Sequence, residues 1–144
     1  MIIGFAGRSG VGKTTAAVHL WQTRGWHVAS FAGAVKMVCH LLWELGATQL
    51  FGSERETVDP RYNATPRHLM QQVGQKMREI DRDVWVRSLM HGIEDKDDVA
   101  VDDVRYANEV EAIHERGGIV IYIERRGREQ MTHESETQPI AELA

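Results

Sequence analysis

Cysteine is almost absent from this sequence. Cys39 is the single one, which excludes an internal disulfide and suits a reducing compartment such as the cytoplasm. No apolar run approaches the roughly 20 residues of a membrane-spanning helix, and the amino terminus lacks the basic segment of a signal peptide. Basic residues number 17 against 21 acidic ones, so the net charge of −4 gives no global attraction to nucleic acid polymers or anionic membranes. We expect a cytoplasmic protein with neither as a partner.

Repeats and low-complexity segments are also missing. The seven histidines are scattered without a second ligand at helical spacing, so the sequence does not predict a zinc site. A chain of 144 residues with 42% hydrophobic and 26% charged residues fits one globular domain with one core. We therefore treat residues 1–144 as a single domain.

The most specific motif follows the first apolar run, residues 2–6. Residues 7–14 read G-R-S-G-V-G-K-T, the G-x-x-x-x-G-K-T pattern of a phosphate-binding loop (P-loop) between a strand and a helix. Backbone N–H groups hold the phosphates at the positive end of the helix dipole, Lys13 adds a charge, and Thr14 offers a hydroxyl to Mg²⁺. The missing N-K-x-D guanine motif disfavours a GTPase, and we expect a nucleoside triphosphate with Mg²⁺ at this loop. The expected nucleotide-binding residues are Gly7, Ser9, Gly10, Val11, Gly12, Lys13, Thr14 and Thr15.

Short apolar runs alternate with segments of helical periodicity. Four strands are predicted at 2–6, 26–31, 99–101 and 119–123, and five helices at 15–24, 35–45, 66–80, 84–91 and 106–116. This alternation predicts an α/β fold, a three-layer sandwich of the P-loop nucleoside triphosphate hydrolase type, with a parallel sheet of about four strands and helices on both faces. Residues 46–64 are polar and irregular, and we expect a connection there.

Two of the helices have an apolar stripe at helical spacing, which predicts the faces that turn to the core. The first stripe is Val35, Val38, Leu42 and Leu45, and the second is Leu69, Val73, Met77 and Ile80. Cys39 lies within the first helical pattern and is expected to be a small core residue. Thr65 is a plausible N-cap for the 66–80 helix, with Pro66 at its first position.

Charged residues follow the later strands. Asp102 and Asp103 come directly after the 99–101 run, where such folds deliver a carboxylate to the metal. Arg105 follows them, and Arg125, Arg126 and Arg128 follow the last strand; guanidinium groups match phosphate oxygens, although a basic solvated turn is the alternative reading of the last three. Because phosphoryl transfer needs positioning and charge stabilisation, these features favour a kinase of a small anionic acceptor.

Several segments together resemble the deoxynucleoside monophosphate kinases known chiefly from bacteriophages. They are the P-loop, S-F-A-G-A-V-K at 30–36, T-P-R-H-L-M-Q at 65–71 with Gly74 and Arg78, D-V-R-Y-A-N-E at 103–109, and H-E-S-E at 133–136. The resemblance runs from the first strand to about residue 136. It implies transfer of the γ-phosphoryl group of ATP to a deoxynucleoside 5′-monophosphate, giving ADP and the diphosphate, so the partners are these small molecules.

The resemblance also implies roles for individual residues. Asp103 supports the metal together with Thr14, with Asp102 as the second choice. A helical insertion at about 46–92 binds the monophosphate, and a short lid at about 125–136 covers the reacting phosphates. The implied substrate-binding residues are Lys36, Arg67, Gln71, Arg78 and Arg105, and the implied catalytic residues are Lys13, Arg105, Arg125, Arg126 and Arg128. Asn108 and Glu109 fit helix-start chemistry equally well.

The sequence departs from the family pattern at its end. Family members usually continue after H-x-S-E into another strand, whereas this chain stops at Ala144. The final strand is therefore expected to be absent, replaced in an oligomer such as a homodimer, or lost in a shortened form, since an open sheet edge invites pairing. Two other functions stay open: an ATP-binding module without catalysis, and a kinase of another small acceptor such as dephospho-coenzyme A.

Overall fold

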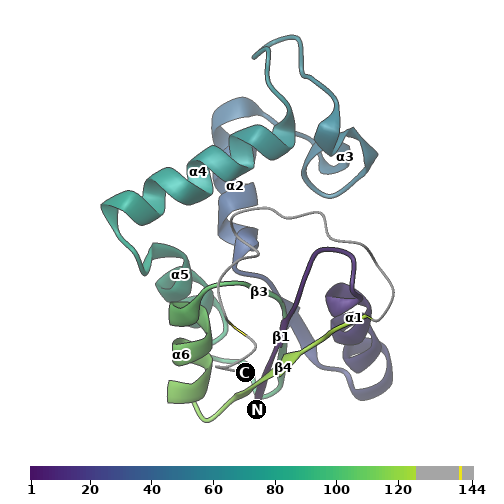
Figure 1. The fold of residues 1–144 in the computed structure, drawn as a ribbon, viewed down its shortest axis with the longest axis vertical. Helices are drawn as coiled ribbons and strands as arrows, with labels where there is room; N and C mark the ends of the chain where they lie inside the picture. The colour runs from purple at the N-terminus through teal and green to yellow at the C-terminus, as the bar shows by residue number, and fades with distance from the viewer. Residues whose placement is uncertain (126–139, 141–144) are drawn as a thin grey trace. The chain divides into compact units, whose positions relative to one another are not determined.

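The computed structural model describes residues 1–125 and residue 140 of the chain. It divides into two compact units, which we name the sheet unit (Met1–Phe31 and Leu89–Ala144) and the helical unit (Ala32–Ser88). Figure 1 labels the elements. In chain order they are β1 (Ile2–Ala6), α1 (Lys13–Arg24), β2 (His27–Ala29), α2 (Ala32–Trp43), α3 (Ala47–Leu50), the 3₁₀ helix η1 (Ser53–Glu56), α4 (Pro66–Ile80), α5 (Val84–Gly92), β3 (Val99–Val104), α6 (Ala107–Glu115) and β4 (Ile119–Tyr122).

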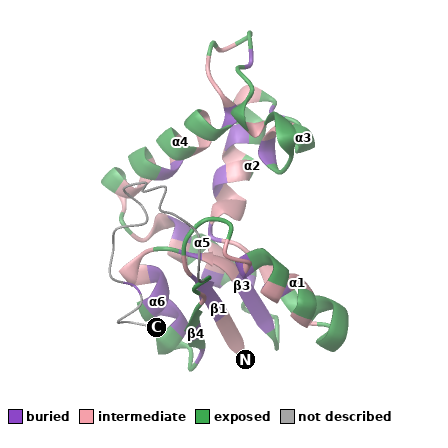
Figure 2. Cartoon of the chain, turned by 45° about the vertical axis from the view of Figure 1, so that its right-hand side comes forward, coloured by how far each residue is buried: buried purple, intermediate pink, exposed green. Residues whose placement is uncertain are grey.

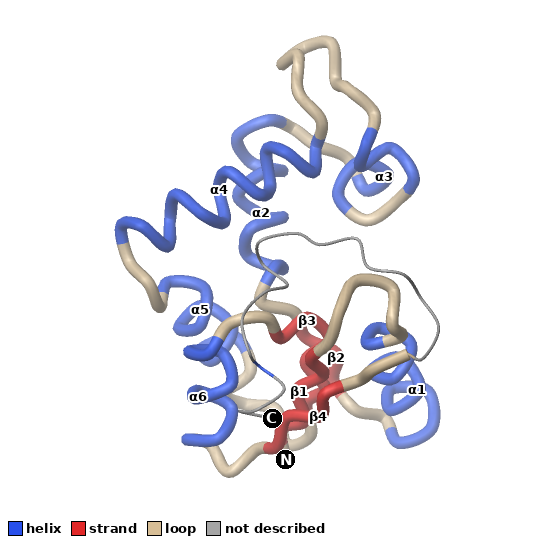
Figure 3. Tube along the Cα trace, viewed as in Figure 1, coloured by secondary structure: helices blue, strands red, loops and turns tan. Residues whose placement is uncertain are grey.

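The four described strands form one parallel sheet in the order β2-β3-β1-β4. The chain passes from β1 to β2 through α1 and from β3 to β4 through α6, and these two helices lie on opposite sides of the sheet (Figures 1 and 3). The predicted α/β sandwich with a parallel sheet is thereby confirmed. β1 and β3 are neighbours whose connections leave in different directions, and ligands bind at the carboxyl ends of strands at such a point.

Alternation along the strands decides which residues meet which helix. Phe5 is buried on the α1 side in a cluster with Ala17 and Ala100. Its neighbour Gly4 faces α6, where a Cβ would lie 2.7 Å from the Cδ1 atom of Ile113. Figure 2 shows buried residues on β1 and β3, the two central strands. The core of the sheet unit therefore consists of two apolar layers, one on each face.

The register between β1 and β3 shifts near their carboxyl ends. Gly4 lies opposite Val101, but Ala6 lies opposite Val104, so β3 advances by one residue more than β1. An extra residue of this kind is a β-bulge, which bends a strand and changes the direction of its side chains. The shift falls at Asp102 and Asp103, the two carboxylates that the sequence placed at the end of this strand.

The helical unit has its own core, in which α2 packs against α4. Buried Val35, Cys39 and Trp85 contact the apolar side of α4, formed by Leu69, Met70, Val73 and Met77. The indole Nε1 of Trp85 donates a hydrogen bond to the carbonyl of Gly74 at 3.0 Å. Burial raises the pKa of the Cys39 thiol to about 11, and the prediction that Cys39 is a core residue is confirmed.

Both predicted apolar stripes are partly wrong. Leu42 is 66% exposed and Ile80 is 79% exposed, so neither belongs to the core. α2 buries Val35 and Cys39, which are one turn apart, and ends at Trp43, before Leu45 is reached. Leu45 is fully buried, but from the loop after a left-handed Glu44. Ile80 is the last residue of α4.

Two predicted helix boundaries are confirmed by the backbone. α1 ends at Arg24 with Gly25 in the left-handed conformation, and its N–H bonds back to the helix. The Thr65 hydroxyl accepts a hydrogen bond from the N–H of His68, with Pro66 at the first position of α4. Each of these boundary contacts is made between residues that are close together in the sequence.

Residues 46–64 are more ordered than the expected irregular connection, because one buried carboxylate organises them. Asp59 accepts hydrogen bonds from the backbone N–H and the guanidinium of Arg61, and from the side-chain amide of Gln49 at 2.8 Å. Gln49 in turn accepts from the N–H of Gly46, at the start of α3. The adjacent guanidinium holds the pKa of Asp59 well below its usual range.

We predict that Gly4→Ala destabilises the protein by about 1–3 kcal/mol, the usual cost of overpacking a filled core. The added methyl group would meet the Cδ1 of Ile113 and, at 2.9 Å, the Cγ2 of Val104. Urea unfolding followed by circular dichroism measures the change. Gly92→Ala is the matched control, since a Cβ at Gly92 meets nothing within 4 Å. Equal stability of the two variants would contradict the packing described for Gly4.

We also predict a pH-dependent contribution from Asp59. Its folded pKa is depressed, so its stabilising effect is complete above the pKa of an unfolded aspartate, about 3.9, and is lost as the pH falls below that value. Urea unfolding of the wild type and of Asp59→Asn between pH 6 and pH 2 provides the comparison. The wild type should have the higher free energy of unfolding at pH 6, and the difference between the two proteins should shrink below about pH 4. A constant difference across this range would show that the charge of Asp59 is not responsible.

Candidate functional site

The P-loop connects β1 to α1 through glycines with positive φ. Gly7 has φ +133°, and a Cβ there would lie 2.3 Å from the carbonyl oxygen of Ile123, so the loop can pass the residue after β4 this closely only with glycine at this position. Gly12 has φ +112°, and a Cβ there would meet nothing within 4 Å. Glycine is therefore needed at position 7 because the backbone of Ile123 leaves no room for a side chain. At position 12 it leaves the end of the loop open to close approach by a ligand.

Lys13 is buried at the first position of α1, with 7% of its surface exposed. Its Nζ donates hydrogen bonds to the carbonyl oxygens of Gly7 at 2.7 Å and Arg8 at 2.8 Å. The ammonium group is therefore held inside the loop by the loop's own backbone. A buried cation in this position provides a fixed positive charge for an anionic ligand.

The amino terminus of α1 is suited to an anion. Its N-cap is Gly12, no side chain caps the helix, and the first turn contains no acidic residue. The N–H groups of a helix's first turn, together with the helix dipole, form an anion-binding site. The loop glycines, the buried lysine and this uncapped helix of 12 residues fit a phosphate group.

A pair of oxygen atoms lies beside this helix end. The hydroxyl of Thr14, in the first turn of α1, donates a hydrogen bond of 2.9 Å to Asp102 Oδ2, from β3. A hydroxyl and a carboxylate are ligand types that Mg²⁺ takes in nucleotide sites, where phosphates and water supply the rest. The described residues include no group of three or more histidine, cysteine or acidic side chains that could hold a metal.

Asp103 lies next to Asp102 but has different partners. Its Oδ2 accepts a hydrogen bond from the hydroxyl of Ser30 at 2.7 Å, and its Oδ1 accepts one from the N–H of Phe31 at 2.8 Å. Both partners belong to the segment after β2. Of the two carboxylates that the sequence left open for the metal, Asp102 is therefore the one that contacts Thr14.

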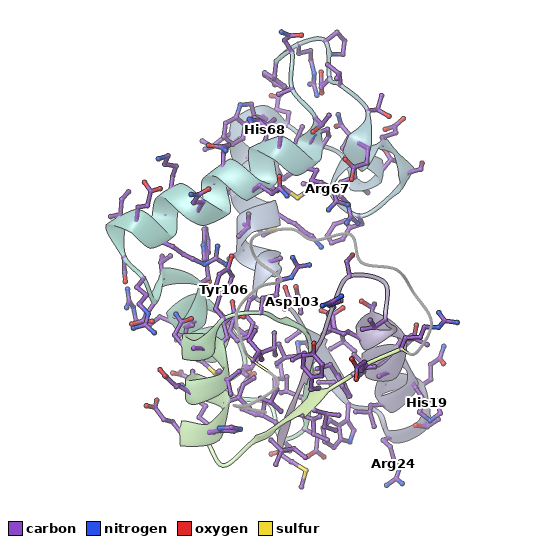
Figure 4. The ribbon with its side chains drawn as sticks, viewed as in Figure 1. His19, Arg24, Arg67, His68, Asp103 and Tyr106 are labelled. Atoms are coloured by element: carbon purple, nitrogen blue, oxygen red, sulfur yellow. The ribbon has the colours of Figure 1, made fainter. Side chains whose placement is uncertain are left out.

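Arg105 follows β3 and has an exposed side chain and a fixed backbone. Its N–H and that of Tyr106 donate hydrogen bonds to Glu109 Oε2, at 2.7 and 3.0 Å. Glu109 is buried, with 2% of its surface exposed, and lies in the first turn of α6, where a glutamate can close the turn before a helix. Figure 4 labels Asp103 and Tyr106, which precede and follow Arg105 in the sequence. The prediction that Glu109 serves at the start of a helix is thus confirmed, and the same side chain also holds the backbone of Arg105.

Three of the predicted substrate-binding residues share one face of α4. Arg67, Gln71 and Arg78 are separated by 4 and 7 positions, which brings them to the same side of a helix with about 3.6 residues per turn. Gly74 lies on this face between Gln71 and Arg78, and a Cβ there would lie 3.4 Å from Nη1 of Arg78. We name Arg67, Gln71, Gly74 and Arg78 the polar stripe of α4. Their offsets could have revealed it in the sequence.

Two members of the predicted substrate set have contacts of their own within the helical unit. Arg67 forms an ion pair with Glu56 of η1, and Figure 4 labels it beside His68 at the beginning of α4. The ammonium group of Lys36 lies 4.3 Å from the ring centroid of Phe51, a cation–π distance. Both contacts hold long cationic side chains in defined positions.

The remaining predicted residues follow β4. Arg125 is exposed, and Arg126, Arg128 and the segment 133–136 lie outside the described residues. The predicted lid and the limits of the predicted helical insertion therefore stay predictions. In the part of the chain that the structure covers, no helix combines the length and apolarity required to cross a membrane.

Comparison with known proteins identifies the family. The family model described as "Deoxynucleotide monophosphate kinase" matches residues 44–139. A protein of Acanthamoeba polyphaga mimivirus, named as a candidate deoxynucleotide monophosphate kinase, is 34% identical over 162 aligned residues, which cover 96% of this chain and 81% of that protein. The family match spans most of the helical unit and continues through the D-V-R segment, and the relative extends the similarity to the P-loop. The chain therefore belongs to the deoxynucleotide monophosphate kinase family.

Proposed function

We propose that the protein transfers the γ-phosphoryl group of ATP to a deoxynucleoside 5′-monophosphate, producing ADP and the deoxynucleoside diphosphate. The observation that carries this proposal is the presence, in a chain of this family, of two separate groups of cationic and polar residues that suit phosphates: the P-loop with buried Lys13, and the polar stripe of α4. A kinase that joins two nucleotides needs one such group for each.

ATP is assigned to the P-loop. The glycines at 7, 10 and 12 have positive φ and allow the backbone N–H groups to face the phosphates. Lys13 would leave one or both carbonyls of Gly7 and Arg8 to reach the β- and γ-phosphates, and its charge would stabilise the transferring group. Ser9, Gly10, Val11, Thr14 and Thr15 complete the proposed cradle.

Thr14 and Asp102 are the proposed residues of the Mg²⁺ site. When bound, Mg²⁺ neutralises charge on the β- and γ-phosphate oxygens and orients them. The protein's part is to keep the Thr14 hydroxyl and the Asp102 carboxylate close together, as the 2.9 Å contact does, at the end of the P-loop. Asp102 lies in β3 and Thr14 follows β1, so the parallel pairing of these two strands holds both residues at the same edge of the sheet.

The deoxynucleoside monophosphate is assigned to the helical unit. Arg67 and Arg78 can each contact phosphate oxygens with two N–H groups, and Gln71 can donate from its amide. Gly74, at the centre of the stripe, is buried, and its carbonyl accepts the hydrogen bond from Trp85. Lys36, beside Phe51, is a further proposed contact. Arg105 and, after β4, Arg125, Arg126 and Arg128 are proposed to stabilise the charge of the transferring phosphate.

No general base is needed in this scheme, because the acceptor is already an ionised phosphate oxygen. Catalysis then depends on bringing that oxygen into line with the γ-phosphate and on excluding water, which would otherwise accept the phosphate. The proposed lid at about 125–136 would serve the second purpose.

We predict that the purified chain with ATP and Mg²⁺ forms ADP when at least one of the four common deoxynucleoside monophosphates is added. Lys13→Ala should lower the rate by about 100-fold or more, because it removes the charge held inside the P-loop. A coupled assay of ADP formation measures both. Absence of ADP above the acceptor-free control with every monophosphate would contradict the proposed function, and ADP formation with dephospho-coenzyme A alone would support the other acceptor.

We also predict that Arg78→Gln raises the KM for the monophosphate roughly tenfold or more, the loss expected for one charge-assisted hydrogen bond. The KM for ATP should change little, because the variant leaves the P-loop intact. Initial rates with one substrate varied at a time separate the two constants.

Lys76→Gln is the matched control for this variant. Lys76 lies nine positions after Arg67, about two and a half turns, and therefore on the opposite side of α4, where it pairs with Glu79. It should leave both constants within about twofold, since an exposed pair contributes little. Equal effects of the two variants would contradict the assignment of the polar stripe to the acceptor.

A further inference from the structure

Two adjacent carboxylates at the end of β3 contact different parts of the sheet unit. Asp102 contacts Thr14, at the start of α1. Asp103 contacts Ser30 and Phe31, after β2. Because β3 lies between β1 and β2 in the sheet, the two side chains join the strand end to its two neighbours, one on each side.

The β-bulge explains how consecutive residues reach these partners. Asp102 lies two positions after Ala100, which is buried against α1, so alternation directs it to the same face and toward Thr14. The register shift between Val101 and Val104 then inserts one extra residue relative to β1. The side chain of Asp103 therefore does not follow the alternation of the strand between the two faces of the sheet. It contacts Ser30 and Phe31, after β2.

The contacts of Asp103 also extend the connection between β2 and β3 beyond the last backbone pair of the two strands. The β2–β3 ladder stops at Ala29 opposite Val101. Two residues later, the Asp103 carboxylate accepts the N–H of Phe31 and the hydroxyl of Ser30, in place of the carbonyl that a longer strand would supply. Phe31 is buried and precedes Ala32, where α2 and the helical unit begin.

We propose that Asp103 is a positioning residue that anchors the departure of the chain into the helical unit, and that it is not a metal ligand. The inference rests on the proposed function and deepens it, since the helical unit is assigned the acceptor. A fixed point of departure limits the paths that α2 can take from the sheet. Misplacement of an acceptor by about 1 Å is enough to cost roughly 100-fold in rate.

The competing role for Asp103 is the one implied by the family resemblance, a direct part in Mg²⁺ binding. The contacts favour the anchor, because both carboxylate oxygens face donors of the β2 segment. A cation at Asp103 would share oxygens that already accept bonds from Ser30 and Phe31, whereas Asp102 Oδ2 lies beside the Thr14 hydroxyl, at the start of α1.

The experiment compares three variants of the full chain: Asp103→Ala, Asp103→Asn and Asp102→Asn. Asp103→Ala removes both acceptors and should lower kcat/KM for the monophosphate about 10- to 100-fold, with the half-saturating Mg²⁺ concentration within about twofold of wild type. Asp103→Asn retains an oxygen for the N–H of Phe31 and should recover most of the loss. Asp102→Asn should instead raise the half-saturating Mg²⁺ concentration about tenfold or more.

Hydrogen exchange of the Phe31 amide, measured without nucleotide or metal, provides a readout that is independent of activity. Asp103→Ala should accelerate exchange of this amide, while the amides of the β2–β3 ladder stay protected and show that the sheet is intact. A Mg²⁺ requirement raised in Asp103→Asn as much as in Asp102→Asn would overturn the proposal. Unchanged Phe31 exchange in Asp103→Ala would overturn it as well.

The two proposals fail in different ways. If the wild-type chain forms no diphosphate from any monophosphate, the proposed function fails, and the exchange of the Phe31 amide still decides whether Asp103 anchors the β2 segment. If the wild type is active and Asp103→Ala keeps the wild-type kcat/KM, the anchor has no part in the reaction and the inference alone is rejected.

Discussion

The backbone pairing of β1 with β3 determines where the groups of the proposed nucleotide site lie. Parallel register brings the carboxyl ends of both strands to the same edge of the sheet, so the P-loop after β1 and the carboxylates at the end of β3 become neighbours although about 90 residues separate them in sequence. Gly7 allows the loop to leave β1 beside the backbone of Ile123, and α1 then begins at Lys13. Each later contact, such as that of Thr14 with Asp102, depends on this register.

The position of the polar stripe in the helical unit is set by helix packing. α4 uses its apolar side to pack against α2 through Leu69, Val73 and Met77, and the polar stripe occupies another side of the same helix. Packing therefore fixes the helix and, with it, the direction of the stripe. The hydrogen bond from Trp85 to the carbonyl of Gly74 ties α5 to the middle of α4, where this glycine is buried and a Cβ would lie 4.0 Å from the Cγ2 of Val35 in α2.

Features that depend on adjacent residues could be predicted from the sequence. The errors concern features that depend on contacts between distant parts of the chain. The P-loop, the Gly25 stop and the Thr65 cap were readable because each depends on a few adjacent residues. Leu42 and Ile80 fit the helical period yet are exposed, because the period does not reveal where a partner helix ends. The sequence could not show which of Asp102 and Asp103 contacts Thr14, since their directions depend on a β-bulge, and a bulge depends on the register of a neighbouring strand. Residues 46–64 looked irregular because their order comes from the side-chain bonds of Asp59, not from periodicity.

The burial of Cys39 makes the chain convenient for spectroscopic work. With its thiol enclosed between α2 and α4 and its pKa near 11, this residue carries almost no thiolate at neutral pH, and thiolate is the form that alkylating reagents attack. A cysteine introduced at an exposed position would thus be labelled selectively, with the native residue left in place. Pairs of spin labels or fluorophores, one in each unit, could then follow the separation between the sheet unit and the helical unit in solution as nucleotides are added.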